Sequence, residues 1–160
     1  MLLKSCLRLL PVVLASALSV FVIEAQMSPT LTVAPVPTVK TAKGSEMAVT
    51  VKASLPPGFH ANTNKPTEAY LIPLSLKWTG GPLEAGEVEY PKGTMEKYSF
   101  SEKPLSVVTG EFSITTKFKV PAKASSGVGA QSGTLRYQAC NDKACFPPKT
   151  VNVSFTVSVE

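Results

Sequence analysis

Residues 137–148 read YQACNDKACFPP, and the rest of the chain is organised around this stretch. It holds two of the three cysteines, Cys140 and Cys145, which are separated by four residues that favour a turn. The flanking segments, residues 132–139 and 150–159, have the composition of β-strands. The sequence therefore predicts a strand–loop–strand unit whose two cysteines lie close enough to form a disulfide.

Most of the remaining sequence also has the pattern of a β-protein. The last segment alternates apolar and polar residues from Val151 to Val159, which is typical of a half-buried strand. No amphipathic helix is evident. Short strands separated by Gly and Pro turns, in a chain of this length, indicate an all-β, antiparallel β-sandwich. We predict further strands at residues 47–53, 70–78, 86–90 and 112–120, and a loop of small residues at 122–133.

The first 25 residues have the features of a secretory signal peptide. Lys4 and Arg8 form the positively charged n-region, and an apolar run from Leu9 to Ile23 follows. We expect residues 1–25 to be removed together with Cys6, which leaves a periplasmic or secreted protein. The alternative is an uncleaved N-terminal anchor.

The mature chain is predicted to form one domain. Residues 26–38 are rich in Pro, Thr and Val and form a linker or an N-terminal edge segment, and residues 39–160 form the domain. The formal net charge is +5, but the lysines are scattered and no aromatic residues interleave with them, which argues against nucleic-acid binding. No further long apolar run exists, so we expect a soluble monomer.

Taken alone, the cysteine pair has three interpretations. The first is a non-cycling, structural disulfide in a secreted structural or binding β-sandwich, although closing so short a loop stabilises a fold by only about 2 kcal/mol. The second is a redox-active pair, because short-loop disulfides are common where the bond opens and closes. Lys143 between the cysteines would lower a thiol pKa, and Asp142 opposes it. The third is a copper site, in which both thiols act with His60 or Met95.

The stretch at 137–148 resembles the redox-active segment of the N-terminal periplasmic domain of DsbD thiol–disulfide interchange proteins, the "disulfide bond corrector" family. Two further segments are similar to that family. One is LPPGFHANTNKP at 55–66, followed by YLIPL at 70–74. The other is YPKG at 90–93, which leads into FSEKPL at 100–105. Their order and spacing extend the resemblance over nearly the whole mature chain.

The resemblance implies an immunoglobulin-like sandwich with the cysteines on its final hairpin. It implies that Cys140 and Cys145 cycle between dithiol and disulfide, as in a protein-disulfide-reductase relay, with Cys145 bonding the partner and Cys140 resolving the mixed disulfide. Electrons would arrive from a membrane electron transporter and a thioredoxin-like donor. They would leave to thioredoxin-fold acceptors such as disulfide isomerases and cytochrome c maturation proteins. No cofactor and no metal ligand are expected.

The resemblance also implies a loop that covers the cysteines, matched here by residues 95–102. Phe100 is the first candidate for the covering ring and Tyr98 the second, and the alternative for Phe100 is an ordinary core residue. Tyr137 lies three residues before Cys140, so strand alternation places the two on opposite faces. Tyr137 either packs in the core or acts as a phenol that tunes the thiols.

The remaining expectations concern His60 and the departures of the chain from the family pattern. His60 is expected to be a structural residue with its hydrogen bonds satisfied. The chain departs from the family pattern in having four residues between the cysteines, where the best-known members have five. It also ends at Glu160, so we expect the electron-supplying domains in separate proteins, unless the chain is a fragment.

Overall fold

The structure is a computed structural model that describes residues 29–160. The predicted signal peptide, residues 1–25, and Cys6 therefore lie outside the described residues. All regular structure in residues 29–160 is β-strand, which confirms the predicted all-β class. Within that range, no helix is long and apolar enough to cross a membrane.

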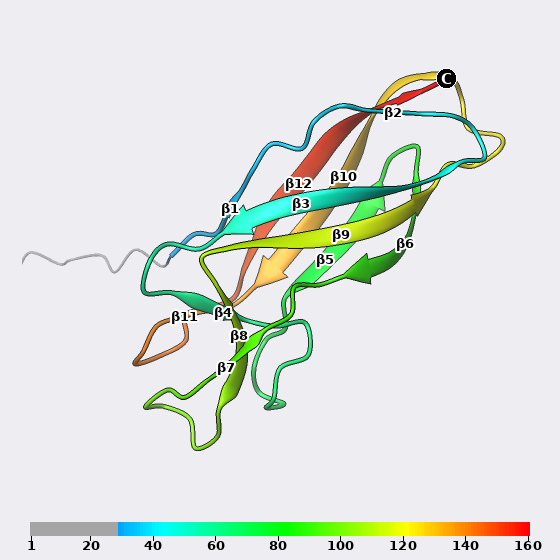
Figure 1. Ribbon diagram of the computed structural model, residues 1–160. Coiled ribbons are helices and arrows are strands. Elements are labelled where there is room, and N and C mark those ends of the chain that lie inside the picture. The colour runs from blue at the N-terminus through cyan, green and yellow to red at the C-terminus, as the bar shows by residue number, and fades with distance from the viewer. Residues whose placement is uncertain (1–28) are drawn as a thin grey trace, which may run out of the picture.

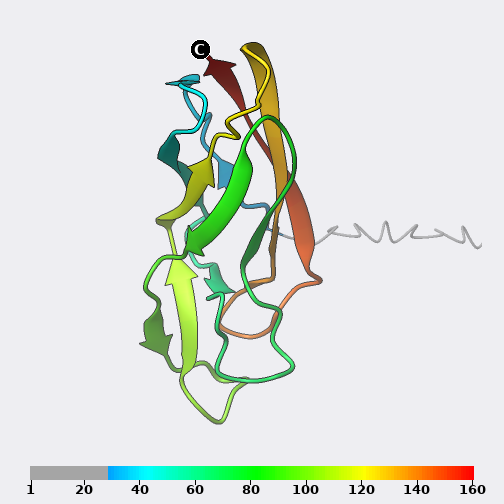
Figure 2. The same cartoon turned by 90° about the vertical axis from the view of Figure 1, so that its right-hand side faces the viewer.

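Two four-stranded sheets form the sandwich (Figure 1) and face each other when viewed from the side (Figure 2). The first sheet has the order β1 (Thr32–Val33), β3 (Glu46–Ser54), β9 (Glu111–Lys119) and β6 (Glu84–Glu89). The second has the order β2 (Val39–Thr41), β12 (Lys149–Val159), β10 (Gly127–Tyr137) and β5 (Ser75–Gly80). Pairing is antiparallel except between β2 and β12, which run parallel.

Alternation explains why the long strands form the sandwich. In β12 the apolar residues from Val153 to Val159 are buried at every second position, and in β9 Phe112, Ile114 and Phe118 are buried in the same way. Because successive side chains of a strand point to opposite faces, each sheet buries one apolar face against the other. These side chains form what we call the main core, which consists of two adjoining clusters between the sheets.

A third, smaller sheet lies at one end of the sandwich, at the lower side of Figure 1. Its order is β11 (Ala139–Cys140), β4 (His60–Asn62), β8 (Leu105–Thr109) and β7 (Thr94–Glu96). The chain enters β4 soon after β3, and it passes from β8 into β9 and from β10 into β11. Strands of both large sheets therefore lead directly into the third sheet and position it.

The predicted strands at 47–53, 112–120 and 150–159 are confirmed, as is the edge strand near 86–90, which corresponds to β6. Two predictions were wrong in part, and both errors concern where a strand begins.

The predicted strand 70–78 begins only at Ser75, because residues 70–73 form a bend that includes Pro73 and a hydrogen bond from Leu71 N to Glu68 O. The predicted loop 122–133 becomes strand from Gly127 onward. Its small residues have little strand propensity, but they pair in continuous register with β12 as far as Val159.

The N-terminal segment of the described chain contributes to both large sheets. Thr32 pairs with Ser54 in the first sheet, and Val39 pairs with Val157 in the second. Pro35 and Pro37 lie between these two short strands, where their missing N–H groups interrupt no ladder.

Candidate redox site

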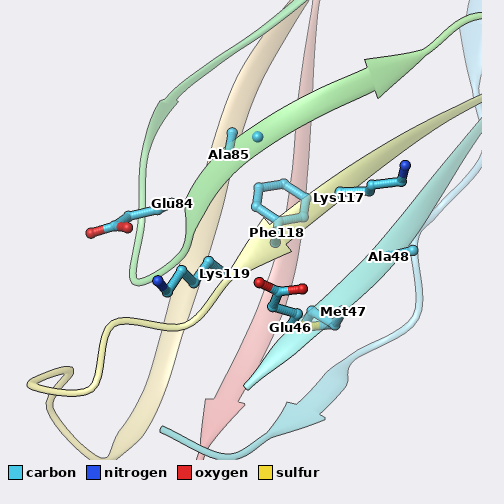
Figure 3. A pocket seen from close by; sticks show the side chains of 9 residues that line it. Glu46, Met47, Ala48, Glu84, Ala85, Lys117, Phe118 and Lys119 are labelled. Carbon is cyan, nitrogen blue, oxygen red and sulfur yellow. The ribbon is translucent and has the colours of Figure 1, made fainter. Parts of the chain in front are cut away.

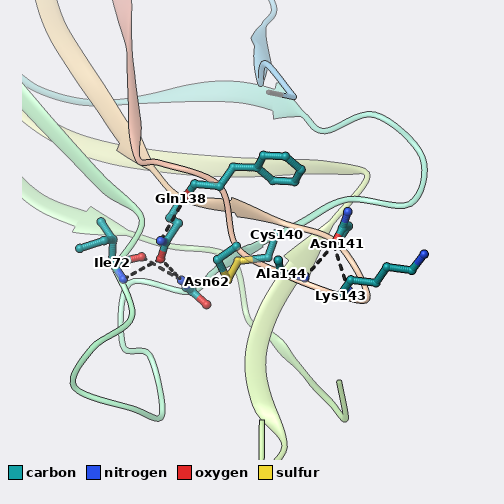
Figure 4. Close-up of a disulfide and its surroundings, with 9 residues drawn as sticks. Asn62, Ile72, Gln138, Cys140, Asn141, Lys143 and Ala144 are labelled. Atoms are coloured by element: carbon teal, nitrogen blue, oxygen red, sulfur yellow. Dashed lines mark hydrogen bonds between the residues drawn. A yellow bond between two sulfur atoms is a disulfide. The ribbon is translucent and has the colours of Figure 1, made fainter. Parts of the chain in front are cut away.

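The two cysteines form a disulfide within a tight turn, residues 140–145, which we call the cysteine turn. The Cys140 and Cys145 Cα atoms are 3.9 Å apart. Asn141 shapes the turn: its side-chain Oδ1 accepts hydrogen bonds from the backbone N–H groups of Lys143 and Ala144, each at 2.9 Å (Figure 4). Asn141 N also donates to Ala144 O at 2.9 Å. An asparagine that bonds its own backbone in this way is typical of turns.

Gln138 fastens the cysteine turn to the neighbouring segments. Its Oε1 accepts hydrogen bonds from Ile72 N at 3.1 Å and from Asn62 Nδ2 at 3.4 Å (Figure 4). Its Nε2 donates to Phe146 O at 3.3 Å. One amide therefore joins the strand before the turn, the chain after it, β4 and the 70–74 bend.

The third sheet has two faces with different compositions. Ala61, Ala139 and Val108 belong to the main core, so they define the inner face of the sheet. His60 pairs directly with Cys140, and because alternation turns both side chains away from Ala61 and Ala139, they share the opposite face. We call this the outer face. It also carries Asn62, which is fully buried.

The outer face has a small apolar cluster of its own. Leu71, Leu105 and Val107 are buried there, and Tyr98, Phe100 and Cys145 are partly buried against them. Cys140 is fully buried, whereas Cys145 is of intermediate exposure. Cys145 is therefore closer to solvent than Cys140.

Tyr98 and Phe100 come from the segment between β7 and β8, residues 97–104, which we call the cap loop. The cap loop differs slightly from the predicted range of 95–102, because residues 95 and 96 belong to β7. The Tyr98 ring is stacked on the His60 ring with centroids 3.9 Å apart and planes 16° apart. Phe100 lies parallel to both, 5.5 Å from Tyr98 and 6.5 Å from His60.

Polar contacts hold the cap loop in shape and attach it to the cysteine turn. Lys97 Nζ donates to the carbonyl oxygens of Ser101 and Glu102, which closes the loop on itself. Ser99 Oγ donates to Asp142 O at 2.8 Å, which links the cap loop to the cysteine turn. An ion pair between Lys103 and Glu68 and a hydrogen bond from Thr67 Oγ1 to Pro104 O attach the end of the cap loop to the segment after β4.

Burial changes the acid–base properties of the ring stack. His60 is 2% exposed, and desolvation lowers its pKa from 6.5 to about 4. Its imidazole is therefore neutral at pH 7. The pKa of Tyr98 is raised, first by burial and then by the negative charge of Glu96.

The sequence profile described as "Thiol:disulfide interchange protein DsbD, N-terminal" matches residues 29–156, which is most of the chain. The chain belongs to this family. The predicted resemblance is thereby confirmed, and thiol–disulfide interchange is the activity of the family. Cys140 and Cys145 form the disulfide in the described part of this DsbD N-terminal domain.

The chain is also similar to solved structures at low sequence identity. The reduced N-terminal domain of Neisseria meningitidis DsbD is 21% identical, with a TM-score of 0.45, over 72% of this chain and 80% of that one. The seventh ScaB type I cohesin of Pseudobacteroides cellulosolvens is 17% identical, with a TM-score of 0.45, over 81% of this chain and 92% of that one. No curated protein sequence matches the chain. The predicted antiparallel, immunoglobulin-like sandwich is confirmed by the two large sheets of this chain.

Of the other residues singled out from the sequence, Lys143 and Tyr137 lie apart from the ring stack. Lys143 is exposed in the cysteine turn. Tyr137 is fully buried in the main core, where its hydroxyl accepts a hydrogen bond from Leu31 N at 2.9 Å and donates to Pro29 O at 3.5 Å. Since Tyr137 and Ala139 share the main core, Tyr137 and Cys140 lie on opposite faces, as alternation predicts.

Sequence reasoning assigned no site role to Asn62 or Gln138, and it treated His60 as structural except as a possible ligand in the copper-site alternative. All three lie within or beside segments that carry the family resemblance. The pattern of a polar residue between apolar neighbours does not single them out, because exposed strand residues such as Ser154 and Thr156 share it. Their convergence on one face depends on long-range strand pairing, which local patterns do not reveal.

Neither cysteine lines the groove described below, and the described residues offer no metal centre at the disulfide. In residues 29–160, no three His, Cys, Asp or Glu side chains are grouped so as to hold a metal ion. An open groove with a volume of about 610 Å³ lies at the other end of the first sheet, lined among others by Glu46, Glu84, Lys117 and Lys119 (Figure 3). It shares no residue with the outer face.

Proposed function

We propose that this protein is a periplasmic thiol–disulfide exchange domain that relays electrons between thioredoxin-fold partners through a reversible Cys140–Cys145 disulfide. One observation carries the proposal. The disulfide lies on the outer face of the third sheet, beside the cap loop, and neither cysteine is a member of the main core. The bond can therefore open while the sandwich keeps its packing.

The exchange proceeds in two displacement steps. In the dithiol form, the Cys145 thiolate attacks one sulfur of a partner disulfide, and the partner's other sulfur leaves as a thiolate and takes up a proton. Cys140 then attacks Cys145 Sγ and releases the partner's remaining sulfur. Two electrons pass to the partner, and the domain retains the Cys140–Cys145 disulfide. The partial exposure of Cys145 and the full burial of Cys140 support these roles.

The cap loop protects the pair between partners. Tyr98 and Phe100 pack against the same small cluster as Cys145, so the rings limit the access of small oxidants and reductants to the disulfide. A partner opens the cap loop by replacing the stack on His60 and the hydrogen bond from Ser99 to the cysteine turn. Lys143, exposed beside the cysteines, stabilises a thiolate at the surface.

The compartment and partners follow from the same proposal. Residues 1–25 direct export, and residues 39–160 act as one monomeric domain in an oxidising compartment. A thioredoxin-like donor, itself supplied by a membrane electron transporter, reduces the domain. The domain then reduces thioredoxin-fold acceptors, of which cytochrome c maturation proteins are one kind.

The first test is the reduction potential of the mature protein, measured by equilibration against a dithiothreitol or glutathione series. We expect a value between about −270 and −120 mV, the range of thioredoxin-fold proteins, with the near-UV circular dichroism of a folded domain in both states. A value below about −300 mV, or unfolding on reduction, overturns the relay and leaves a structural disulfide.

A second test assigns the two cysteines. Cys140→Ala should accumulate a mixed disulfide with a thioredoxin-fold partner, because Cys145 attacks and nothing resolves the product. Cys145→Ala should accumulate much less, because Cys140 is fully buried. The opposite pattern would reverse the roles of the two cysteines.

A further inference from the structure

Two buried side-chain polar atoms in residues 29–160 have no hydrogen-bond partner, and both belong to β4. They are His60 Nε2 and Asn62 Oδ1. Buried polar atoms in proteins are nearly always paired, so an unpaired one requires an explanation. Both residues lie on the outer face, the face that carries Cys140.

His60 and Cys140 are directly opposite each other on adjacent strands. Side chains paired in this way have Cβ atoms about 4.5–5.5 Å apart and point to the same face. His60 is 2% exposed and Cys140 is 0% exposed, so bulk water does not reach either side chain. On the other side of His60, β8 contributes Thr109, which does not titrate.

The surroundings of His60 favour a neutral ring with a free acceptor. The titratable side chains packed against it are Cys140 on β11 and Tyr98 of the cap loop. The charged side chains of the two covering segments are all exposed; they are Glu96, Lys97, Glu102, Lys103, Asp142 and Lys143. Stacking on Tyr98 fixes the plane of the imidazole. Burial lowers the pKa of His60 to about 4 while the disulfide is closed, so the ring is neutral at pH 7. A thiolate forming beside the ring raises its pKa again, because the negative charge stabilises the imidazolium.

Cys140 needs such an acceptor. Only a thiolate attacks a disulfide, and burial in apolar surroundings raises a thiol pKa. Because Cys140 is fully buried, it resolves a mixed disulfide only if a neighbouring group takes its proton.

We propose that His60 is the proton acceptor for Cys140 in the resolving step, an inference that rests on the exchange function proposed above. The Cys140 proton passes to His60 Nε2 while the Cys140 sulfur attacks Cys145 Sγ. The Cys140–Cys145 bond forms, and the bond between Cys145 and the partner breaks. The electron pair of that bond leaves with the partner's sulfur, which takes up a proton. The imidazolium then loses this proton to solvent, and when the domain is itself reduced, the Cys140 thiolate takes up a new proton through His60.

The test is the reaction of the fully reduced mature protein with Ellman's reagent in a stopped-flow instrument. The first thionitrobenzoate is released when Cys145 attacks the reagent, and the second when Cys140 resolves the mixed disulfide. His60→Gln keeps a side chain of similar size that does not accept a proton. At pH 7 it should slow the second release about 100-fold, as expected for loss of a general base, and change the first less than twofold.

The pH profile provides the readout that a structural role would not move. In the natural protein the rate of the second thionitrobenzoate release should stop rising with pH by about pH 7. In His60→Gln it should keep rising about tenfold per pH unit until the thiol itself ionises, above about pH 8.5. The natural protein's profile alone suffices if the variant does not fold, because a rise continuing past about pH 8.5 would overturn the inference.

A matched control keeps the ring stack intact. Tyr98→Phe removes only the phenol, so its second release should follow the natural profile. A His60→Gln variant with an unchanged second release, or a Tyr98→Phe variant that loses the plateau, would overturn the role of His60. If the natural protein releases no second equivalent at all, the proposed exchange function itself fails, which is a distinguishable result.

Discussion

The main core and the outer face of the third sheet meet at β4, whose three residues are all buried, yet the two regions are built differently. Ala61 packs into the main core, where interlocking apolar side chains come from two large sheets. His60 and Asn62 point to the outer face, where both buried polar atoms without partners are found within residues 29–160. The apolar cluster there is small and is closed by a loop rather than a sheet.

Because of this difference, the stability of the domain depends on the main core, and the reactivity of the disulfide depends on the outer face. The main core supplies the free energy that holds β4 and β11 in register. The outer face therefore tolerates unpaired polar atoms and a removable cover, which a region responsible for stability would not. Substitutions in the two regions should consequently have different readouts, and the predictions below proceed from the largest effect to the smallest.

Truncating a side chain of the main core should have the largest effect on the free energy of unfolding. It should have little effect on the rate of thiol–disulfide exchange. Phe118 is 2% exposed and makes edge contacts with Trp78 and Phe155 at ring-centroid distances of 5.2 and 5.8 Å. Phe118→Ala should lower the free energy of unfolding by about 3–5 kcal/mol in denaturant titration. The rate of disulfide reduction should stay within about twofold at a temperature where the variant is folded.

The control is Val128→Ala, a truncation of a side chain that is 76% exposed, which should change stability by less than about 0.5 kcal/mol. If Phe118→Ala instead removed exchange activity while the protein was still folded, the two regions would not be separable.

The pH dependence of stability should reveal the buried imidazole. The pKa of His60 is about 4 in the folded protein, against 6.5 for an ordinary histidine. Between these pH values the unfolded chain binds more protons than the folded protein. The contribution of neutral His60 to the free energy of unfolding is therefore fully present above about pH 6.5 and is lost as the pH falls towards 4. The loss is at most about 3 kcal/mol.

Carboxyl groups also titrate in this range, so the informative quantity is the difference between the natural protein and His60→Gln. The slope of unfolding free energy between pH 6.5 and 4 should be shallower in the variant. Equal slopes would mean that the imidazole is not buried in the folded state in solution.

Removing a cap ring should raise reactivity without a comparable loss of stability. Tyr98 and Phe100 are only partly buried, so Phe100→Ala should cost less than a main-core truncation. It should speed reduction of the disulfide by dithiothreitol about tenfold, which corresponds to about 1.4 kcal/mol in the opening equilibrium. Met95→Ala, on the neighbouring β7, truncates a side chain that is 60% exposed and should leave the rate unchanged. A slower or unchanged rate in Phe100→Ala would show that the ring does not shield the sulfurs.

Local sequence patterns predicted the buried face of β12 well, because alternation depends on neighbouring residues alone. They failed at Gly127–Gln131, where the strand is specified by its partner β12 rather than by its own propensity. The family resemblance selected three segments far apart in the chain, and strand pairing brings them together at the third sheet. The pairing of His60 with Cys140, 80 residues later, is a property of register, so a lone histidine gave no indication of it.

The smallest effect should come from the hydrogen bond that joins the two loops over the outer face. Ser99 Oγ donates to Asp142 O at 2.8 Å near the surface, where such a bond stabilises by roughly 0.5–1.5 kcal/mol. Ser99→Ala should therefore speed reduction by dithiothreitol about threefold, less than Phe100→Ala does. Thr79→Val, which removes a hydroxyl bonded to Ser132 O in the second sheet, is the matched control and should leave the rate unchanged. Equal rates in Ser99→Ala and Thr79→Val would mean that ring stacking on His60, rather than this hydrogen bond, determines how often the cap loop opens.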